Sequence, residues 1–338
     1  MRALFDWNVL KPLNLGRLIN LARVNISFHA SGLRKKSRVW GYPYILTIEP
    51  TNRCNLRCPQ CVTGAGTMRR SSCDLHLELY RQILNEIGSG LWYLVLYNQG
   101  EPFLHPDLIT MIHHAKQQNI YVITSTNGHF LSDSHVCEDV VRSGLDKIII
   151  SLDGADEETY SNYRYGGDFN RVVAGIKLLI EMKKRLRKKN PIVVVQFLIM
   201  RHNEHQMEDV KKLAKSLGVD RQVFKTIQII DANTSEKYTP TSKRLSRYET
   251  VDGDLTLKYL PNRCRRLWTS TTILSNGDVV PCCFDKEGSY RFGTITTEQT
   301  LKVIWRSSDY ERFRTRNLHD RREIDICRNC SQGQKVYI

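Results

Sequence analysis

The stretch CNLRCPQC, residues 54–61, places three cysteines directly after an apolar run at 44–48. Three thiols are too few to close a tetrahedral zinc site, and a disulfide would leave one of them over. Either a fourth ligand comes from elsewhere, with His76 and Cys73 as candidates, or a metal keeps one coordination position open. Thiolates are the usual ligands of iron–sulfur clusters, so these three favour a [4Fe–4S] cube with one open iron.

Short β-rich segments alternate with helical segments between residues 44 and 230. The predicted strands lie at 44–51, 93–100, 121–128, 147–154, 192–200 and 223–230, and the predicted helices near 75–89, 106–118, 132–143, 170–188 and 203–217. The strands are nearly continuous apolar runs, which is typical of a parallel sheet covered on both faces. This order predicts an α/β fold of six β/α units, either a partial barrel or an open doubly wound sheet.

Polar residues that are unusual for a core follow four of these strands. In parallel β/α folds the chemistry lies at the C-terminal ends of the strands, so we expect these residues to share one site. They are Cys54, Cys58 and Cys61 after the first strand, Gln99, Gly100, Glu101 and Pro102 after the second, Ser125, Asn127 and Gly128 after the third, and Ser151, Asp153 and Gly154 after the fourth.

A second group of cysteines lies between residues 264 and 330. Its members are Cys264, Cys282, Cys327 and Cys330, with Cys283 beside Cys282. Four thiolates suffice for a closed site, which zinc and an iron–sulfur cluster would both accept. We prefer Cys282 as the ligand and keep Cys283 as its alternative. The remaining two, Cys73 and Cys137, are expected to be small buried apolar residues.

Composition and charge narrow the class of protein. Ten cysteines in 338 residues are too sparse for a disulfide scaffold, and no apolar stretch is long enough to span a membrane, so we expect a cytoplasmic protein. The formal net charge of +15 indicates an anionic partner, such as a phosphorylated substrate or an anionic membrane surface, or else a solvated basic surface. Nucleic acid is not expected as a partner, because the sequence has no interleaved aromatic platform.

The chain divides into four predicted parts. Residues 1–43 form a helical extension, 44–230 the β/α core, 231–263 a polar linker or bridge, and 264–338 a small cysteine-rich domain. The extension carries an apolar stripe with helical spacing at Leu15, Leu18, Ile19, Ala22 and Ile26, interrupted by Arg17 and Arg23. We expect this amphipathic helix to pack on the domain behind it, with a peripheral position on a membrane surface as the alternative.

Over residues 44–230 the sequence resembles the radical SAM superfamily. The defining C-x3-C-x2-C motif is Cys54, Cys58 and Cys61, and the loop at 99–102 is similar to the GGEP loop of that family. Gln99 stands where the family has its first glycine, and Gln60 stands where an aromatic residue often precedes the third cysteine. The fold that this resemblance implies is a partial (β/α)6 barrel of the TIM type.

The resemblance also implies contacts with S-adenosylmethionine (SAM). Glu101 in its loop would bind the amino group, Arg164 the carboxylate, and Ser151 and Asp153 the ribose. The full implied set is Gly100, Glu101, Ser125, Asn127, Ser151, Asp153, Arg164 and Gln196.

The C-terminal cysteines resemble the SPASM/Twitch tail of radical SAM enzymes, in the shorter Twitch form. This implies one auxiliary [4Fe–4S] cluster on Cys264, Cys282, Cys327 and Cys330. The implied enzyme reductively cleaves SAM to a 5′-deoxyadenosyl radical and abstracts a substrate hydrogen, for a dehydrogenase-like oxidation. Alternatives are a peptide-modifying maturase and an enzyme for a lipid-linked, phosphorylated or other small-molecule intermediate. The implied partners are a small-molecule or peptide substrate and an electron donor such as flavodoxin or ferredoxin.

Overall fold

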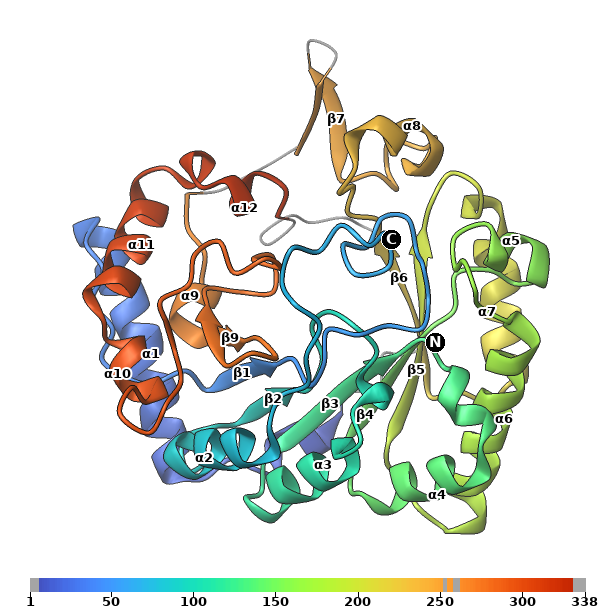
Figure 1. Ribbon diagram of the computed structural model, residues 1–338, viewed down its shortest axis with the longest axis horizontal. Coiled ribbons are helices and arrows are strands. Elements are labelled where there is room, and N and C mark those ends of the chain that lie inside the picture. The colour runs from blue at the N-terminus through green and yellow to red at the C-terminus, as the bar shows by residue number, and fades with distance from the viewer. Residues whose placement is uncertain (1–5, 252–253, 258–261, 331–338) are drawn as a thin grey trace.

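A curved nine-stranded sheet forms the centre of the computed structural model, which describes residues 6–251, 254–257 and 262–330 (Figure 1). Its strand order is β11-β10-β9-β1-β2-β3-β4-β5-β6. The parallel part consists of β1 (Ile45–Ile48), β2 (Tyr93–Val95), β3 (Tyr121–Thr126), β4 (Lys147–Ser151), β5 (Ile192–Ile199) and β6 (Arg221–Thr226). These strands follow one another in chain order without the reversal of a doubly wound sheet, so the partial barrel is confirmed.

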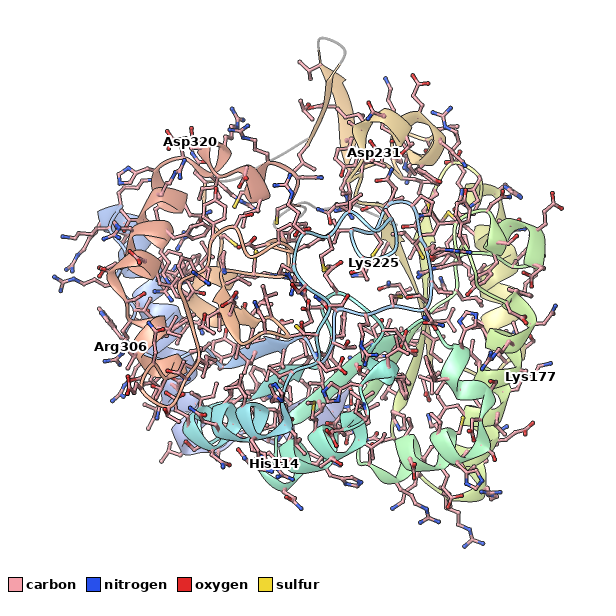
Figure 2. The ribbon with its side chains drawn as sticks, viewed as in Figure 1. His114, Lys177, Lys225, Asp231, Arg306 and Asp320 are labelled. Carbon is pink, nitrogen blue, oxygen red and sulfur yellow. The ribbon has the colours of Figure 1, made fainter. Side chains whose placement is uncertain are left out.

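Helices cover the outer face of this sheet (Figure 1). They are α2 (Leu77–Ile87), α3 (Leu108–Gln117), α4 (Ser134–Arg142), α5 (Glu157–Ser161), α6 (Phe169–Arg185) and α7 (Met207–Ser216). Each of the longer ones turns an apolar stripe inward, as α2 does with Tyr80, Ile83 and Leu84. The polar side chains His114 on α3 and Lys177 on α6 point outward (Figure 2). The predicted alternation of strands and helices is therefore confirmed.

The C-terminal part of the chain extends the same sheet. Strand β9 (Ser270–Ile273), which follows α9 (Arg266–Thr269), pairs in parallel with β1. Strands β10 (Asp278–Val280) and β11 (Gly293–Thr294) continue it antiparallel. Three helices follow, α10 (Leu301–Trp305), α11 (Ser308–His319) and α12 (Asp325–Arg328). The cysteine-rich segment is thus hydrogen-bonded to the barrel edge.

The segment between β6 and α9 lies at the rim of the barrel (Figure 1). The sequence predicted a loop-rich bridge here, and the structure adds short regular elements to it. These are α8 (Ser235–Tyr238) and a two-stranded antiparallel sheet of β7 (Tyr248–Val251) and β8 (Asp254–Leu257).

Helix α1 (Leu15–Arg34) confirms the predicted N-terminal helix but not its orientation. The helix packs on the domain as expected, but its apolar stripe does not face the domain, because Leu15, Leu18, Ile19 and Ile26 are exposed to solvent. The face toward the barrel instead carries Arg17, Val24, Ser27, Phe28 and Ser31. The hydrophobic period predicts the helix, but a polar anchor determines which side of it is buried.

Arg17 is that anchor. Its guanidinium donates hydrogen bonds to the backbone carbonyls of Pro12, Gly88, Gln118 and Asn119, at 2.6 to 3.0 Å. Gly88 and Gln118 cap the C-terminal ends of α2 and α3, where helix carbonyls lack partners and carry partial negative charge. A buried cation therefore satisfies two helix ends at once. Within the described residues, no helix is both long and apolar enough to cross a bilayer.

Candidate functional site

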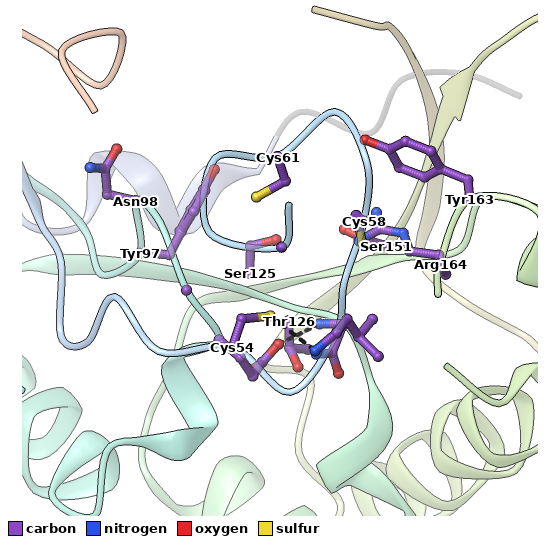
Figure 3. A pocket seen from close by; sticks show the side chains of 15 residues that line it. Cys54, Cys58, Cys61, Tyr97, Asn98, Ser125, Thr126, Ser151, Tyr163 and Arg164 are labelled. Carbon is purple, nitrogen blue, oxygen red and sulfur yellow. Dashed lines mark hydrogen bonds between the residues drawn. The ribbon is translucent and has the colours of Figure 1, made fainter. Parts of the chain in front are cut away.

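A cavity of about 220 Å³ lies at the C-terminal ends of the parallel strands, and the three cysteines of residues 54–61 line it (Figure 3). The structure brings to it six of the eight residues for which SAM contacts were predicted. They are Gly100, Glu101, Ser125, Asn127, Ser151 and Arg164. The other two, Asp153 and Gln196, do not line it. Tyr97, Asn98 and Tyr163 also line the cavity, and no sequence motif singled them out.

The tip of β2 is held against the segment that leads into the cysteines. Gly100 adopts a left-handed conformation with φ of 75°, and a Cβ atom there would lie 2.5 Å from the carbonyl oxygen of Thr51 and 2.6 Å from that of Arg53. The next backbone N–H, that of Glu101, donates to the Arg53 carbonyl at 2.7 Å. Only glycine permits this approach, so position 100 fixes where the glutamate points.

The chemistry of the three thiols fits an iron–sulfur cluster. Burial raises the pKa of Cys54 to about 11 and also raises that of Cys58. A bound iron supplies the positive charge that buried thiolates need, and a coordinating thiol is deprotonated outright. Among the described residues, no three His, Cys, Asp or Glu side chains form a set that could hold a single metal ion. A cube differs from a single ion in that it binds each thiolate through a separate iron.

The zinc alternative needed a fourth ligand, and neither candidate lines this cavity. The Cys73 sulfur lies 3.2 Å from the hydroxyl of Ser275, and His76 is exposed ahead of α2. Cys73 is only partly buried, whereas Cys137 is fully buried and donates to the Leu131 carbonyl at 3.1 Å. The prediction of a small buried cysteine is thus confirmed for Cys137 and wrong for Cys73.

Arg164 lines the cavity and forms an ion pair with Asp153. Its Nε lies 2.6 Å from Oδ2 of Asp153, and its Nη1 lies 3.8 Å from the sulfur of Cys58. Asp153 is fully buried, and its Oδ1 accepts the backbone N–H of Leu198 at 2.7 Å. The carboxylate predicted for the ribose is therefore engaged with β5 and with the arginine. It sets the direction of a guanidinium that faces the cysteine loop.

Glu101 is buried beside the same cavity. Its Oε2 accepts the backbone N–H of Asn127 at 2.7 Å, and its Oε1 accepts that of Phe103 at 3.2 Å. Burial nevertheless raises the pKa of Glu101 to about 7, against the opposing effect of these hydrogen bonds. A cation placed next to this carboxylate would restore its charge.

Gln60 fastens the cysteine loop to the chain after β6. Its side-chain oxygen accepts the backbone N–H groups of Ile230 and Asp231, at 2.6 and 3.0 Å. Its amide nitrogen donates to the hydroxyl of Thr234 at 2.6 Å. Gln60, the residue before the third cysteine, therefore binds the chain after β6 and does not line the cavity.

A second cavity, of about 530 Å³, shares the wall formed by Tyr97 and Asn98. Gln99 lines it on one side, and Arg266, Cys283 and Lys286 from the C-terminal segment line it on the other. The Oδ1 atom of Asn98 is buried and finds no hydrogen-bond partner in the described part of the chain. A buried acceptor of this kind is ready to bind a ligand donor.

The cysteines of the C-terminal segment lie together. Cys264, Cys327 and Cys330 are buried. Burial, followed by the thiols of Cys283, Cys330 and Cys264, raises the pKa of Cys282. Cys283 instead lines the second cavity, where Nη1 of Arg266 donates to its sulfur at 3.3 Å. The two neighbouring cysteines therefore have different surroundings.

Glu49 is a residue that the motif analysis missed. It follows β1 and is fully buried, and it accepts from Asn98 Nδ2 at 2.9 Å and from the hydroxyl of Ser275 at 3.0 Å. One carboxylate thereby joins the tip of β2 to the turn between β9 and β10. The sequence pattern that could have identified Glu49 is an acidic residue at the end of an apolar strand. A buried carboxylate at such a position needs hydrogen-bond or charged partners.

Two family models match the sequence. The model of the Radical SAM superfamily covers residues 48–217, and that of the SPASM iron–sulfur cluster-binding domain covers residues 264–331. The first match runs from the end of β1 to the end of α7 and includes the cysteine loop. The second spans all five cysteines of the C-terminal segment.

Several curated proteins are similar over much of the chain. An AdoMet-dependent heme synthase from Methanosarcina barkeri is 27% identical over 59% of this chain, and the chain spans only 55% of that protein. A PqqA peptide cyclase from Bradyrhizobium diazoefficiens is 23% identical, and the match covers 83% of this chain and 78% of the cyclase. A tungsten-containing aldehyde ferredoxin oxidoreductase cofactor-modifying protein from Pyrococcus furiosus is 25% identical, and the match covers 80% of this chain and 82% of that protein.

Solved structures share the fold. Streptococcus suis SuiB bound to S-adenosylmethionine matches with a TM-score of 0.63 at 17% identity, over 86% of this chain and 72% of its own. BtrN in complex with AdoMet and 2-DOIA matches with a TM-score of 0.52 at 16% identity, over 88% and 97%.

Proposed function

The chain belongs to the radical SAM superfamily, and from this membership we propose that it takes a hydrogen atom from its substrate and completes a dehydrogenase-like oxidation. As a radical SAM enzyme with a SPASM domain, it uses SAM and [4Fe–4S] clusters. Bound at their sites, these groups supply the 5′-deoxyadenosyl radical and an acceptor for the second electron. In the overall balance, the substrate would lose one hydrogen atom to the 5′-deoxyadenosyl radical, one electron to the auxiliary cluster and one proton to water, and the cluster would pass its electron on to the flavodoxin or ferredoxin.

The proposed ligands of the SAM-binding cluster are the three thiols that line the first cavity, Cys54, Cys58 and Cys61. The proposed ligands of a single auxiliary cluster are Cys264, Cys282, Cys327 and Cys330. The burial of three of these thiols, and their effect on the pKa of Cys282, support this set. Cys283 is left out of it, because its sulfur lies at the wall of the second cavity.

Arg164 binds the SAM carboxylate in this proposal. Asp153 orients its guanidinium through one edge, which leaves further N–H groups to donate to a second carboxylate. Glu101 accepts from the SAM amino group, since each carboxylate oxygen keeps a lone pair after binding one backbone N–H. Gly100, Ser125, Asn127 and Ser151 complete the contacts from the cavity wall. Asp153 acts through Arg164, and Gln196 has no part.

The position of the second cavity is the observation that supports the proposed oxidation. It extends from Gln99 and Asn98, beside the first group of cysteines, to Cys283 in the C-terminal segment. A substrate bound there would lie near both groups of cysteines, because Gln99 Oε1 lies 3.8 Å from the sulfur of Cys61 and Cys283 is next to Cys282 in the sequence. A cluster held by the C-terminal cysteines would then offer an acceptor for the second electron, in competition with return of the hydrogen atom from 5′-deoxyadenosine.

The same cavity favours a small substrate with a negatively charged group. Arg266 and Lys286 both line it, and Lys286 Nζ donates to Gln228 Oε1 at 3.1 Å. Two cations in one wall suit a phosphate or a carboxylate. A phosphorylated or lipid-linked intermediate therefore fits better than an uncharged one.

Modification of a peptide is the second candidate, and the similarity to PqqA peptide cyclase favours it. That relative covers most of this chain at an identity too low to transfer a substrate. A peptide with an acidic side chain could present its carboxylate to the same two cations.

The decisive experiment uses anaerobically reconstituted protein with SAM and a flavodoxin or ferredoxin as electron donor. We expect wild type to release 5′-deoxyadenosine, and a C54A/C58A/C61A variant to release none. Iron should fall from about eight to about four atoms per chain in that variant, because one of two [4Fe–4S] clusters is lost. Absence of SAM cleavage by fully loaded wild type would refute the proposed reaction.

Incubation with two substrate pools separates the candidates. The first pool contains phosphorylated and carboxylated small molecules, and the second contains short acidic peptides. A product two mass units lighter, with one 5′-deoxyadenosine per product, is expected from the first pool. A C327A/C330A variant should still cleave SAM but yield no oxidised product. Turnover of the second pool alone would favour the peptide candidate.

A further inference from the structure

Helix α1 lies on the outside of the barrel (Figure 1). Its solvent-exposed side carries an apolar stripe. Its members are Leu15, Leu18, Ile19, Ala22, Ile26 and Leu33, and we call this set the α1 stripe. Their spacing of three, four and seven residues places them in one line along the helix. Leu15 is 74% exposed, Ile26 56% and Leu33 88%. A continuous line of this kind differs from the scattered exposed leucines of ordinary surfaces.

The orientation of α1 is fixed by its opposite face. Besides the four carbonyls bound by Arg17, the Ser31 hydroxyl donates to the Ser27 carbonyl at 2.6 Å and accepts the Arg38 N–H at 3.0 Å. Phe28 packs edge-on against Trp268 with ring centroids 5.3 Å apart. Rotation of the helix to bury the α1 stripe would break the hydrogen bonds of Arg17 to the ends of α2 and α3 and separate Phe28 from Trp268. The stripe therefore stays outside in the folded chain.

Tryptophans lie at both ends of the helix. Trp7 precedes α1 and is 72% exposed, and Trp40 follows it and is also exposed. Tryptophan is the side chain that favours the boundary between lipid headgroups and acyl chains. Two exposed tryptophans therefore flank the helix in the sequence.

The charge of this segment has one sign. Between Asp6 and Glu49 the sequence contains no acidic residue, and it contains the cations Lys11, Arg17, Arg23, Arg34, Lys35, Lys36 and Arg38. All of these except Arg17 are exposed. A second copy of the chain would bring two such positive segments together, which like-charge repulsion opposes. The complementary partner is an extended anionic surface.

We propose that α1 lies flat on an anionic membrane surface. The α1 stripe inserts at the boundary of headgroups and acyl chains, and the exposed cations contact lipid phosphates. The helix docks in the plane of the membrane and does not cross it. This proposal does not depend on the proposed reaction, because α1 lines neither of the two cavities.

Vesicle sedimentation of the reconstituted protein tests it. We expect wild type to pellet with vesicles of phosphatidylcholine containing about one-third phosphatidylglycerol, and to bind pure phosphatidylcholine at least about tenfold more weakly. An L15Q/L18Q/I26Q variant should lose about tenfold or more in partitioning. A K35E/K36E variant should lose most of the preference for anionic vesicles. The matched control is V303Q on α10, at a valine that is 58% exposed, which should bind like wild type.

Far-UV circular dichroism and iron content verify that each variant is folded, and the replaced side chains are all exposed. Wild type that stays in the supernatant with anionic vesicles would overturn the proposal. So would a stripe variant that still pellets like wild type, because charge alone would then explain binding. If wild type ignores vesicles but forms a dimer that the stripe variant lacks, the stripe is an interface between copies instead.

Discussion

The guanidinium of Arg70 lies 2.9 Å from the carboxylate of Glu49 in a buried ion pair at the end of β1. Arg70 belongs to the long loop that begins with the cysteines, and its Nε donates to the Lys286 carbonyl at 2.8 Å. The pair therefore connects the first cysteine loop with the C-terminal segment. Together with the hydrogen bond to Lys286, the ion pair holds together the two segments that carry the proposed cluster ligands.

Replacement of Glu49 should be costly for stability. The E49A variant leaves Arg70 buried without its carboxylate and removes the acceptor for Asn98 and Ser275. We expect a loss of about 3–5 kcal/mol in the free energy of unfolding, measured by urea denaturation of the apoprotein. The control is E78A, whose pair with Arg81 is exposed and should change stability by less than about 0.5 kcal/mol. Similar losses for both variants would contradict the role of the buried pair.

Asp153 should act on SAM through Arg164. We expect D153N to weaken SAM binding about tenfold while the iron content is retained, because the guanidinium loses its charged partner. An R164A variant should lose at least as much. In the double variant, loss of SAM affinity should be far less than the sum of the two single effects. Additive losses would show instead that Asp153 contacts SAM by itself.

The pH dependence of stability should reveal Glu101 in the apoprotein. Because burial raises its pKa from 4.5 to about 7, the folded state keeps a proton that the unfolded chain releases at lower pH. Its contribution is fully present below pH 4.5 and is lost as pH rises through about 7. Between these limits, stability of wild type should fall relative to E101Q by on the order of 3 kcal/mol. Urea unfolding at several pH values measures this difference, and a constant difference would contradict the raised pKa.

The two neighbouring cysteines of the C-terminal segment should behave differently. We expect C282A to retain about four irons per chain and C283A to retain about eight, because only Cys282 is a proposed cluster ligand. Iron and sulfide analysis after identical anaerobic reconstitution provides the measurement. If C283A loses the iron and C282A keeps it, the ligand assignment is reversed.

The strand tips were predictable because a parallel β/α order forces them to one edge. Apolar runs located β1 to β6, and the three cysteines meet Gly100, Glu101, Ser125, Asn127 and Ser151 in one cavity as expected. Gln99 lines the second cavity instead. The backbone position of Asp153 was also predicted, but its side chain is held by Leu198 and Arg164 and does not line the first cavity. Side-chain direction depends on partners from β5 and the following loop, which no local pattern reveals.

The orientation of α1 could not be predicted for a related reason. Its hydrophobic period was correct, but Arg17 finds its partners at the ends of α2 and α3, far away in the sequence. Gln60 is a similar case, since its acceptors and donors follow β6. In each case a long-range polar contact decided what periodicity and motif spacing left open.

The pairing of β1 with β9 has a consequence for biosynthesis. Ile45 lies opposite Ser270, so the outer edge of β1 is covered only when β9, more than 200 residues later in the sequence, pairs with it. Such a contact raises the contact order, and folding is slow when distant segments must meet. Until β9 leaves the ribosome, β1 is an open edge that could pair with another chain. The nascent chain therefore exposes this edge of β1 until residues 270–273 have been synthesised.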